Sequence, residues 1–498
     1  MKATEKNELI KTMNTTLKTI GDLRKAKHIS KSIKTEVRDN LIAALQAGKK
    51  SCEGMHGYEQ TVIPQLERAI LSKHNINLLG LRGQGKTRIA RLMIQLLDEH
   101  IPIVAGSEIN DDPFAPISRY AKDIIREKGD ATPIEWLNRD DRFFEKLATP
   151  DVTIADLIGD IDPIKAANLK LSYADDRVLH FGMIPRANRC LFVINELPDL
   201  QARIQVALFN ILEEGDIQIR GFKLRMSLDV QFVFTANPED YTNRGSIVTP
   251  LKDRIGSQIL THYAYDLPTA KRITKQETEK SDSRAIEVYV PELAKDLLEQ
   301  IAFEARVSEF VDPKSGVSAR MSITGYENLI STAERRALLN AETKTSVRFS
   351  DLMGMIPSIT GKVELVYEGE QEGSDFVANH LISEATKTLF LMYFPKIEKL
   401  KKPNQTTVYD AVVDWFIQAD NIELSDEATN KVYQKVLSTL KPLDELLSIY
   451  QPKLAKEDVN FLKEFILWAL VELKQLSKKR TENGILFNDL FDSYLKTM

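Results

Sequence analysis

The sequence predicts an α/β fold, a parallel sheet with helices on both faces, followed by helical regions. Between about residues 57 and 262, short apolar segments alternate with amphipathic ones, as in a parallel sheet covered by helices. From residue 263 onward, apolar residues recur at helical spacing, for example at Leu293, Leu297 and Ile301. The polar stretch G-E-Q-E-G-S-D at residues 369–375 is expected to be a linker or loop. We therefore expect an N-terminal helical segment, an α/β domain, a helical lid and a C-terminal helical extension, at residues 1–56, 57–262, 263–345 and 346–498.

Composition is that of an ordinary globular chain, with 43% hydrophobic and 28% charged residues among 498. The net charge is -5, and Lys and Arg are dispersed, so we expect no nucleic-acid partner. Two cysteines, Cys52 and Cys190, cannot form a disulfide framework and fit a reducing compartment. The N-terminus lacks an apolar signal core, and no apolar run approaches the roughly 20 residues that span a bilayer. We therefore expect a cytoplasmic protein with no membrane segment.

A glycine-rich segment follows a short apolar strand predicted at residues 75–79. It reads G-L-R-G-Q-G-K-T at residues 80–87 and matches the pattern G-x-x-x-x-G-K-[ST]. Behind it, Ile89, Leu92 and Leu96 recur on one helical face. Strand, loop and helix stand in the order that a phosphate-binding loop requires. This context favours the phosphate loop over a glycine-rich turn that matches by chance.

The residue types in this loop suit a bound nucleotide. Glycines let backbone N–H groups turn toward phosphates, and the helix N-terminus favours anions. Lys86 brings a positive charge to the β- and γ-phosphates, and the Thr87 hydroxyl is a ligand for Mg²⁺. We therefore predict ATP and Mg²⁺ as cofactors. Arg82 and Arg88 beside the loop are interpreted as solvated or interface charges. The residues predicted to lie against the nucleotide are Gly80, Gly83, Gln84, Gly85, Lys86, Thr87 and Arg88.

A second buried strand is predicted at residues 190–196, which read C-L-F-V-I-N-E. Ligands of open α/β sheets bind at the carboxyl ends of the strands, where the polar residues of this segment stand. ATPases of this kind usually end the strand in Asp-Glu, with one carboxylate for the Mg²⁺ sphere and one to polarise the attacking water. Here the metal position holds Asn195, which carries no charge. Glu196 remains the candidate general base, so nucleotide binding is a firmer prediction than hydrolysis.

Three more polar residues are candidates for the reaction. Asn237 directly follows a further apolar strand predicted at residues 230–236 and is a candidate to orient water against the γ-phosphate. The alternative is a turn, because Asn-Pro is common in turns. Arg254 is a candidate arginine finger for a neighbouring subunit's nucleotide. Arg320 precedes a predicted helix of the lid and is a candidate γ-phosphate contact. The alternative for either arginine is a surface ion pair.

Several short segments, in order along the chain, match stretches of one ATPase family. Residues 149–151 and 155–159 read T-P-D and A-D-L-I-G, residues 185–189 read P-R-A-N-R, residues 237–239 read N-P-E, and residues 251–256 read L-K-D-R-I-G. Over about residues 54–345, the chain thereby resembles the AAA+ branch that contains the magnesium chelatase ATPase subunit and the MoxR ATPases. Residues 101–140 look like an insertion of chelatase character.

The resemblance implies a homo-oligomeric ring, commonly a hexamer, with ATP between subunits. It implies that Lys86 and Thr87 hold phosphate and Mg²⁺, that Glu196 activates water and that Asn237 is the first sensor. It implies in addition that Arg254 acts in trans and that Arg320 is the lid sensor. An extra element is expected at residues 159–183. A β-hairpin is also expected, because Ile217, Ile219, Leu224 and Met226 alternate with polar residues around a tip at Arg220 and Gly221. Members of this branch often work with a separate von Willebrand factor A protein, and no Asp-x-Ser-x-Ser motif for that role occurs here.

Three functional hypotheses follow. The leading one is a ring ATPase that remodels or activates a partner protein. The second is the motor subunit of a magnesium chelatase, which drives Mg²⁺ insertion into a porphyrin on other chains. The third, motivated by Asn195, is a nucleotide-gated scaffold with slow or no hydrolysis. A helicase or a σ-factor activator is disfavoured by the acidic balance and by the lack of a GAFTGA loop. Aromatic clusters after residue 376, such as Trp468 and its neighbours, are interpreted as a bundle core, or else as a partner groove.

Overall fold

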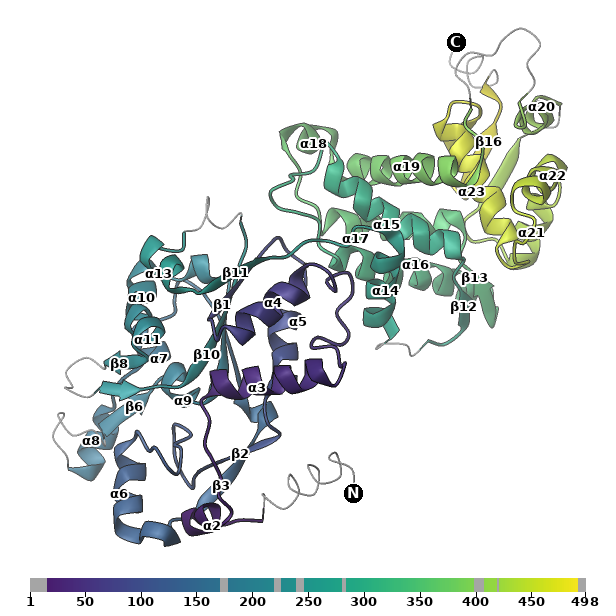
Figure 1. Ribbon diagram of the computed structural model, residues 1–498. Helices are drawn as coiled ribbons and strands as arrows, with labels where there is room; N and C mark the ends of the chain where they lie inside the picture. Colours follow the sequence, from purple (N-terminus) through teal and green to yellow (C-terminus); the bar gives the residue numbers. More distant parts are fainter. Residues whose placement is uncertain are drawn as a thin grey trace. The chain divides into compact units, whose positions relative to one another are not determined.

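The computed structural model describes residues 16–170, 178–218, 225–238, 246–279, 284–397, 407–418 and 421–490. The chain forms two compact units, Met1–His262 and Tyr263–Met498 (Figure 1).

A parallel sheet forms the centre of the N-terminal unit. Among the described residues its strand order is β11-β1-β10-β7-β4, and all four neighbouring pairs are parallel. The strands are β1 (Ile76–Leu79), β4 (Phe143–Leu147), β7 (Cys190–Asn195), β10 (Val230–Ala236) and β11 (Ser257–Leu260). In register, Leu79 pairs with Ala236 and Leu147 with Asn195, so the carboxyl ends of these strands share one edge.

Alternation along the strands gives the sheet an apolar core on each face. On one face, Leu191, Val193 and Val233 pack with apolar residues of α3 (Ile33–Gln46), α4 (Val62–Leu71) and α5 (Lys86–Leu92). On the other face, Phe192, Ile194, Phe232 and Phe234 pack with elements that include α10 (Ala202–Ala207), α11 (Phe209–Glu213) and α13 (Thr249–Arg254). The unit is therefore a three-layer α/β/α structure, and its strands are apolar on both sides as parallel sheets require.

The remaining elements of this unit lie between sheet strands along the chain, except α2, which precedes β1. They are α2 (Ile20–Lys25), η1 (Met93–Leu96), α6 (Arg119–Lys128), η2 (Gly129–Ala131), η3 (Arg139–Arg142), α7 (Ile154–Leu157), α8 (Pro163–Leu169), α9 (Met183–Arg186) and η5 (Leu197–Asp199). Three antiparallel strand pairs are β2 (His100–Val104) with β3 (Ile134–Asn138), β5 (Gly159–Ile161) with β6 (Leu179–Phe181), and β8 (Asp216–Gln218) with β9 (Arg225–Ser227).

These pairs correspond to the three expected additions to the α/β core. The β2–β3 pair and α6 occupy the stretch at residues 101–140, and β5, α8 and β6 occupy the stretch at residues 159–183. The predicted hairpin before the third apolar strand is confirmed by the pairing of Ile217 with Met226. Its predicted tip at Arg220 and Gly221, with Ile219 and Leu224, lies outside the described residues.

The C-terminal unit is mainly helical. Its helices are α14 (Leu267–Thr278), α15 (Glu292–Val307), α16 (Arg320–Leu339), η7 (Phe349–Met355), α17 (Ile356–Thr360), α18 (Tyr367–Glu372), α19 (Ser374–Tyr393), α20 (Asp410–Gln418), α21 (Asn430–Leu437), α22 (Lys441–Tyr450) and α23 (Val459–Glu472). One apolar core runs from α15 and α16 through α19 to α23. Phe465 and Trp468 belong to this core, as the bundle interpretation expects. The boundary at residues 345 and 346 stays a prediction.

The predicted fold class, a parallel α/β sheet with helices on both faces followed by helical regions, is confirmed. Two local expectations were wrong. The extension is not wholly helical, because β14 (Ile422–Ser425), β16 (Gly484–Asn488) and β15 (Ser477–Arg480) form an antiparallel sheet. A two-stranded pair, β12 (Glu287–Tyr289) with β13 (Lys344–Ser346), also occurs in this unit. The polar stretch at residues 369–375, expected as a loop, lies mostly in α18 and the start of α19.

Candidate nucleotide site

The glycine-rich loop connects β1 to α5, as predicted from its sequence. Gly83 and Gly85 both have φ of 71°, a left-handed conformation in which a side chain would be strained. Gly85 is the residue that precedes α5, so the loop enters the helix through this turn. Gly80 N donates to the carbonyl of Ala236 at 3.1 Å, which ties the start of the loop to β10.

The first glycine of the loop is required by close packing. A Cβ built on Gly80 would lie 2.0 Å from Thr261 Oγ1 and 2.2 Å from Gln84 Oε1. These two atoms also bond each other, because Thr261 Oγ1 donates to Gln84 Oε1 at 2.7 Å. Tyr58 adds a contact from the segment before α4, with its hydroxyl 2.7 Å from the Gln84 carbonyl and 2.7 Å from the His262 carbonyl. The loop is therefore braced by residues that the sequence pattern does not reveal.

Lys86 and Thr87 stand at the start of α5. Lys86 Nζ donates to the carbonyls of Gly80 and, at 2.9 Å, Leu81, so its ammonium group lies over the loop. Thr87 Oγ1 donates to Asn195 Oδ1 at 3.3 Å. The loop threonine and the unusual asparagine, which are 108 residues apart, are thus brought together at the sheet edge.

Asn195 is 8% exposed and is held by three side chains. Its Oδ1 accepts from Thr87 and, at 3.0 Å, from Thr235 Oγ1. Its Nδ2 donates to Glu145 Oε1 at 2.6 Å. Glu145 Oε2 accepts from Arg91 Nη2 at 2.8 Å and from Arg91 Nε at 3.1 Å. Sequence reasoning missed Glu145 and Thr235, and the signal for Glu145 was a charged residue inside the otherwise apolar start of a strand.

Glu196 follows β7 and is exposed, with a left-handed φ of 55°. Such a conformation is uncommon for a residue with a side chain and is held here by the surrounding structure. Its backbone N donates to Thr235 Oγ1 at 3.1 Å. Asn237, 8% exposed, follows the neighbouring strand β10 directly. The loop, Asn195, Glu196 and Asn237 therefore stand at one edge of the sheet.

The two arginines have other surroundings. Arg254, at the end of α13, pairs with Glu213 Oε2 at 2.7 Å, donates to Pro250 O at 2.9 Å, and lies 5.1 Å from the centre of the Phe209 ring. Its contacts therefore come from α11 and α13. Arg320 belongs to the C-terminal unit, where it is exposed at the first position of α16. The roles predicted for Glu196, Asn237, Arg254 and Arg320 stay predictions.

The side-chain oxygen atoms at this sheet edge are of the kind that can act as ligands of a magnesium ion. Mg²⁺ keeps several waters and is usually bound through one or two side chains together with substrate phosphates. The Thr87 hydroxyl and the Asn195 carbonyl oxygen are 3.3 Å apart, and the Glu145 carboxylate bonds the same asparagine. No group of three or more His, Cys, Asp or Glu among the described residues could hold an ion by itself.

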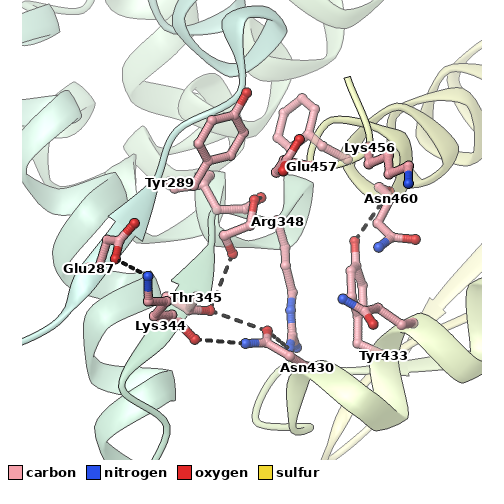
Figure 2. Close-up of a pocket in the computed structure, with 14 residues that line it drawn as sticks. Glu287, Tyr289, Lys344, Thr345, Arg348, Asn430, Tyr433, Lys456, Glu457 and Asn460 are labelled. Carbon is pink, nitrogen blue, oxygen red and sulfur yellow. Dashed lines mark hydrogen bonds and ion pairs between the residues drawn. The ribbon is translucent and has the colours of Figure 1, made fainter. Parts of the chain in front are cut away.

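A separate cavity of about 470 Å³ lies within the C-terminal unit (Figure 2). Lys344 pairs there with Glu287 at 2.6 Å, and Asn430 Nδ2 donates to the Lys344 carbonyl at 3.1 Å. The Arg348 guanidinium lies 4.1 Å from the centre of the Tyr433 ring, and burial lowers its pKa to about 10. No residue predicted to bind the nucleotide lines this cavity.

Comparisons with known proteins give only distant likenesses. No protein-family model matches the chain, and no curated protein matches it. Among solved structures, NtrX from Brucella abortus in complex with ATP is 15% identical, with a TM-score of 0.34, over 59% of this chain and 56% of that chain. A mutant of RuvB from Thermotoga maritima is 12% identical, with a TM-score of 0.31, over 93% of each chain.

A closed-state reconstruction of Hsp104 with ATPγS and FITC casein is 13% identical, with a TM-score of 0.38, over 62% of this chain and 50% of that one. The chain spans about half the length of the NtrX chains that it matches. At these identities and TM-scores, nothing about function is carried over. The fold and site together define a parallel α/β sheet with a glycine-rich loop of the phosphate-binding pattern at its edge, beside the polar ends of two strands. Within the described ranges, no helix has both the length and the apolar character to cross a membrane.

Proposed function

We propose that this protein is a ring-forming AAA+ ATPase that binds ATP with Mg²⁺ and couples binding and hydrolysis to the remodelling or activation of a partner protein. One observation carries the proposal, namely that a complete phosphate loop and the polar ends of β7 and β10 share one edge of a parallel sheet. Ligands of open α/β sheets bind at this edge.

Each residue has a task that suits its chemistry. Lys86 binds the β- and γ-phosphates, and its amine exchanges the carbonyls of Gly80 and Leu81 for phosphate oxygens. Thr87 and Asn195 would hold the Mg²⁺ sphere, and a bound ion would supply positive charge against the phosphates. Glu196, exposed at the end of β7, is the general base for the attacking water. Asn237 at the end of β10 orients that water.

Two arginines complete the proposed site. Arg254 is assigned to the nucleotide of a neighbouring subunit, where an arginine finger stabilises charge in the transition state. Arg320 is assigned to the γ-phosphate from the helical lid. The assembly that these roles require is a homo-oligomeric ring, a hexamer by the resemblance to the MoxR and magnesium chelatase branch. A separate von Willebrand factor A protein is the partner that this resemblance suggests.

Two alternatives keep the same site. A nucleotide-gated scaffold is favoured by Asn195, because an amide lacks the charge that the usual aspartate brings to the metal sphere. A magnesium chelatase motor would use the same ATPase site, with the porphyrin bound on other chains. The scaffold differs from both motors in turnover, and the chelatase differs from the remodelling ATPase in its partner chains.

The nucleotide site is tested by titrating the full chain with a fluorescent ATP analogue. Lys86→Ala is expected to abolish binding, whereas Lys128→Ala, an exposed lysine on α6, leaves it unchanged. Tight binding retained by Lys86→Ala would refute the placement of the site. Steady-state ATPase activity then separates motor from scaffold, since a motor must turn over faster than its Glu196→Gln variant. A wild-type rate no faster than that of Glu196→Gln would favour the scaffold.

A further inference from the structure

Asn195 lacks the negative charge of the usual aspartate, and a carboxylate lies close to it on the neighbouring strand β4. Glu145 lies on β4 two residues before Leu147, which is paired in register with Asn195. Its Oε1 accepts a hydrogen bond of 2.6 Å from Asn195 Nδ2. A carboxylate therefore stands one hydrogen bond behind the amide that faces Thr87.

Hydrogen-bond chemistry fixes which way the amide of Asn195 points. An ionised carboxylate only accepts, so the side that meets Glu145 must be the NH₂ group. The Thr235 hydroxyl accepts from Glu196 N at 3.1 Å, and its own hydrogen is free to be donated to Asn195 Oδ1 at 3.0 Å. The carbonyl oxygen of Asn195 consequently faces Thr87, which is the side of the phosphate loop.

An aspartate at position 195 would conflict with Glu145. Two carboxylates at 2.6 Å cannot both ionise, because like charges at this distance force one of them to keep a proton. Asparagine removes the conflict and receives a charge-assisted bond instead. Asn195 and Glu145 together therefore carry one negative charge. An Asp at position 195 beside a neutral residue would carry the same charge, but here the charge lies on β4.

Arg91 also contacts Glu145, and it offsets only part of this charge at the site. Its guanidinium bonds Oε2, the oxygen that Asn195 does not use. The Arg91 side chain is 61% exposed, and exposed ion pairs are weak because water screens them. Glu145 itself is 25% exposed, so its charge is screened less.

We propose that Glu145 is a positioning residue for the Mg²⁺–nucleotide complex, which orients the Asn195 oxygen toward Thr87 and supplies the negative charge that Asn195 lacks. This inference rests on the proposed function of the site. It differs from a purely structural role because it predicts a specific effect on the Mg²⁺ dependence of nucleotide binding, with little effect on binding without the ion.

The test measures the Kd of the full chain for a fluorescent ATP analogue with saturating Mg²⁺ and with EDTA. Wild type is expected to bind more tightly with Mg²⁺. The Mg²⁺ ratio is the Kd in EDTA divided by the Kd with saturating Mg²⁺. Glu145→Gln should reduce this ratio roughly tenfold, the effect expected for one partly screened charge near an ion. Binding in EDTA should stay within about twofold, since no phosphate contact is lost. Glu135→Gln, at an exposed position of β3, is the matched control and should leave the ratio unchanged.

A charge swap provides the decisive comparison. Asn195→Asp combined with Glu145→Gln moves the carboxylate to the metal side and should restore the Mg²⁺ ratio of the wild type. Arg91→Gln removes the other partner of Glu145 and should leave the ratio equal or raise it. If Glu145→Gln does not fold, Glu145→Asp and the swap carry the same comparison.

The outcomes separate two failures. A wild type whose ATP binding does not depend on Mg²⁺ would refute the proposed function. A Mg²⁺-dependent wild type with an unchanged ratio in Glu145→Gln would overturn the role of Glu145 alone. Equal weakening of binding with Mg²⁺ and with EDTA would also overturn it, because that pattern means only a disturbed loop.

Discussion

Arg142 and Glu36 form a two-point ion pair, in which Nη1 meets Oε1 and Nη2 meets Oε2, both at 2.7 Å. Both side chains are buried. Arg142 also donates to the Arg189 carbonyl, at 2.8 and 3.0 Å. Since Glu36 lies on α3 and Arg142 directly precedes β4, the pair joins the N-terminal helix to the sheet.

Removal of the negative charge from this pair should destabilise the protein strongly. Glu36→Gln leaves the Arg142 guanidinium buried without a counter-charge, a change that costs about 3–5 kcal/mol of unfolding free energy. Urea denaturation of the N-terminal unit within the full chain measures the loss. Glu127→Gln, at an exposed position of α6, is the control. A loss below about 1 kcal/mol, the range of a surface pair, would contradict the prediction.

Gly80→Ala should disable the phosphate loop. The new methyl would meet Thr261 Oγ1 at 2.0 Å and Gln84 Oε1 at 2.2 Å, so both side chains must move. We expect ATP affinity to fall by at least roughly tenfold, because the loop backbone is displaced from its phosphate-binding shape. Gly48→Ala is the control for backbone strain without a clash. Its φ of 68° disfavours a side chain, but its Cβ would meet no atom within 4 Å. Unchanged affinity in Gly80→Ala would show that the packing relaxes without cost.

Arg254→Ala should separate binding from turnover. The pair with Glu213 lies on α11 and α13, and the predicted action of Arg254 is on a neighbouring subunit. We expect ATPase activity to fall by at least roughly tenfold, a lower bound for an arginine finger, with unchanged ATP affinity. Glu213→Gln frees Arg254 from its partner and should not lower the rate. Equal losses of affinity and rate in Arg254→Ala would contradict a role in trans.

Glu299 should make the stability of the C-terminal unit depend on pH. It is 3% exposed, accepts from Thr274 and, at 2.8 Å, from Ser322, and burial raises the pKa of its carboxyl. The charges of Arg306 and Lys271 oppose that shift. Because the folded-state pKa lies above the unfolded one, the folded unit binds the proton more tightly.

The contribution of Glu299 to stability is therefore fully present below its unfolded pKa and is lost as pH rises through the raised folded-state pKa. Glu299→Gln keeps the shape and removes the titration, so its unfolding free energy should change less between acidic and neutral pH than that of wild type. Thermal melts across this range measure the difference. Parallel pH profiles for the two proteins would refute the prediction.

Much of the α/β core could be predicted from local sequence. The segments at β1, β7 and β10 are short and mostly apolar, which predicts buried strands, and β7 and β10 lead into the polar residues Asn195 and Asn237, which predicts a polar edge. The glycine pattern placed the phosphate loop for the same reason. These patterns are local, because each can be recognised within one short segment of the sequence.

Other features depend on partners far away in the sequence. Glu145 stands in a strand with mixed residues, and only the pairing of β4 with β7 brings it to Asn195. The β14–β16–β15 sheet joins segments about 60 residues apart, and short strands such as Ile422–Ser425 carry too few residues to show alternation. Thr261 and Tyr58 brace the loop from flanking segments whose sequence has no phosphate-binding pattern.

The Tyr58 hydroxyl has one hydrogen and two carbonyls at 2.7 Å, that of Gln84 in the phosphate loop and that of His262 at the end of the first unit. A hydroxyl carries a single hydrogen, so the two carbonyls share one donor. One side chain before α4 therefore links the glycine-rich loop to the segment that follows β11.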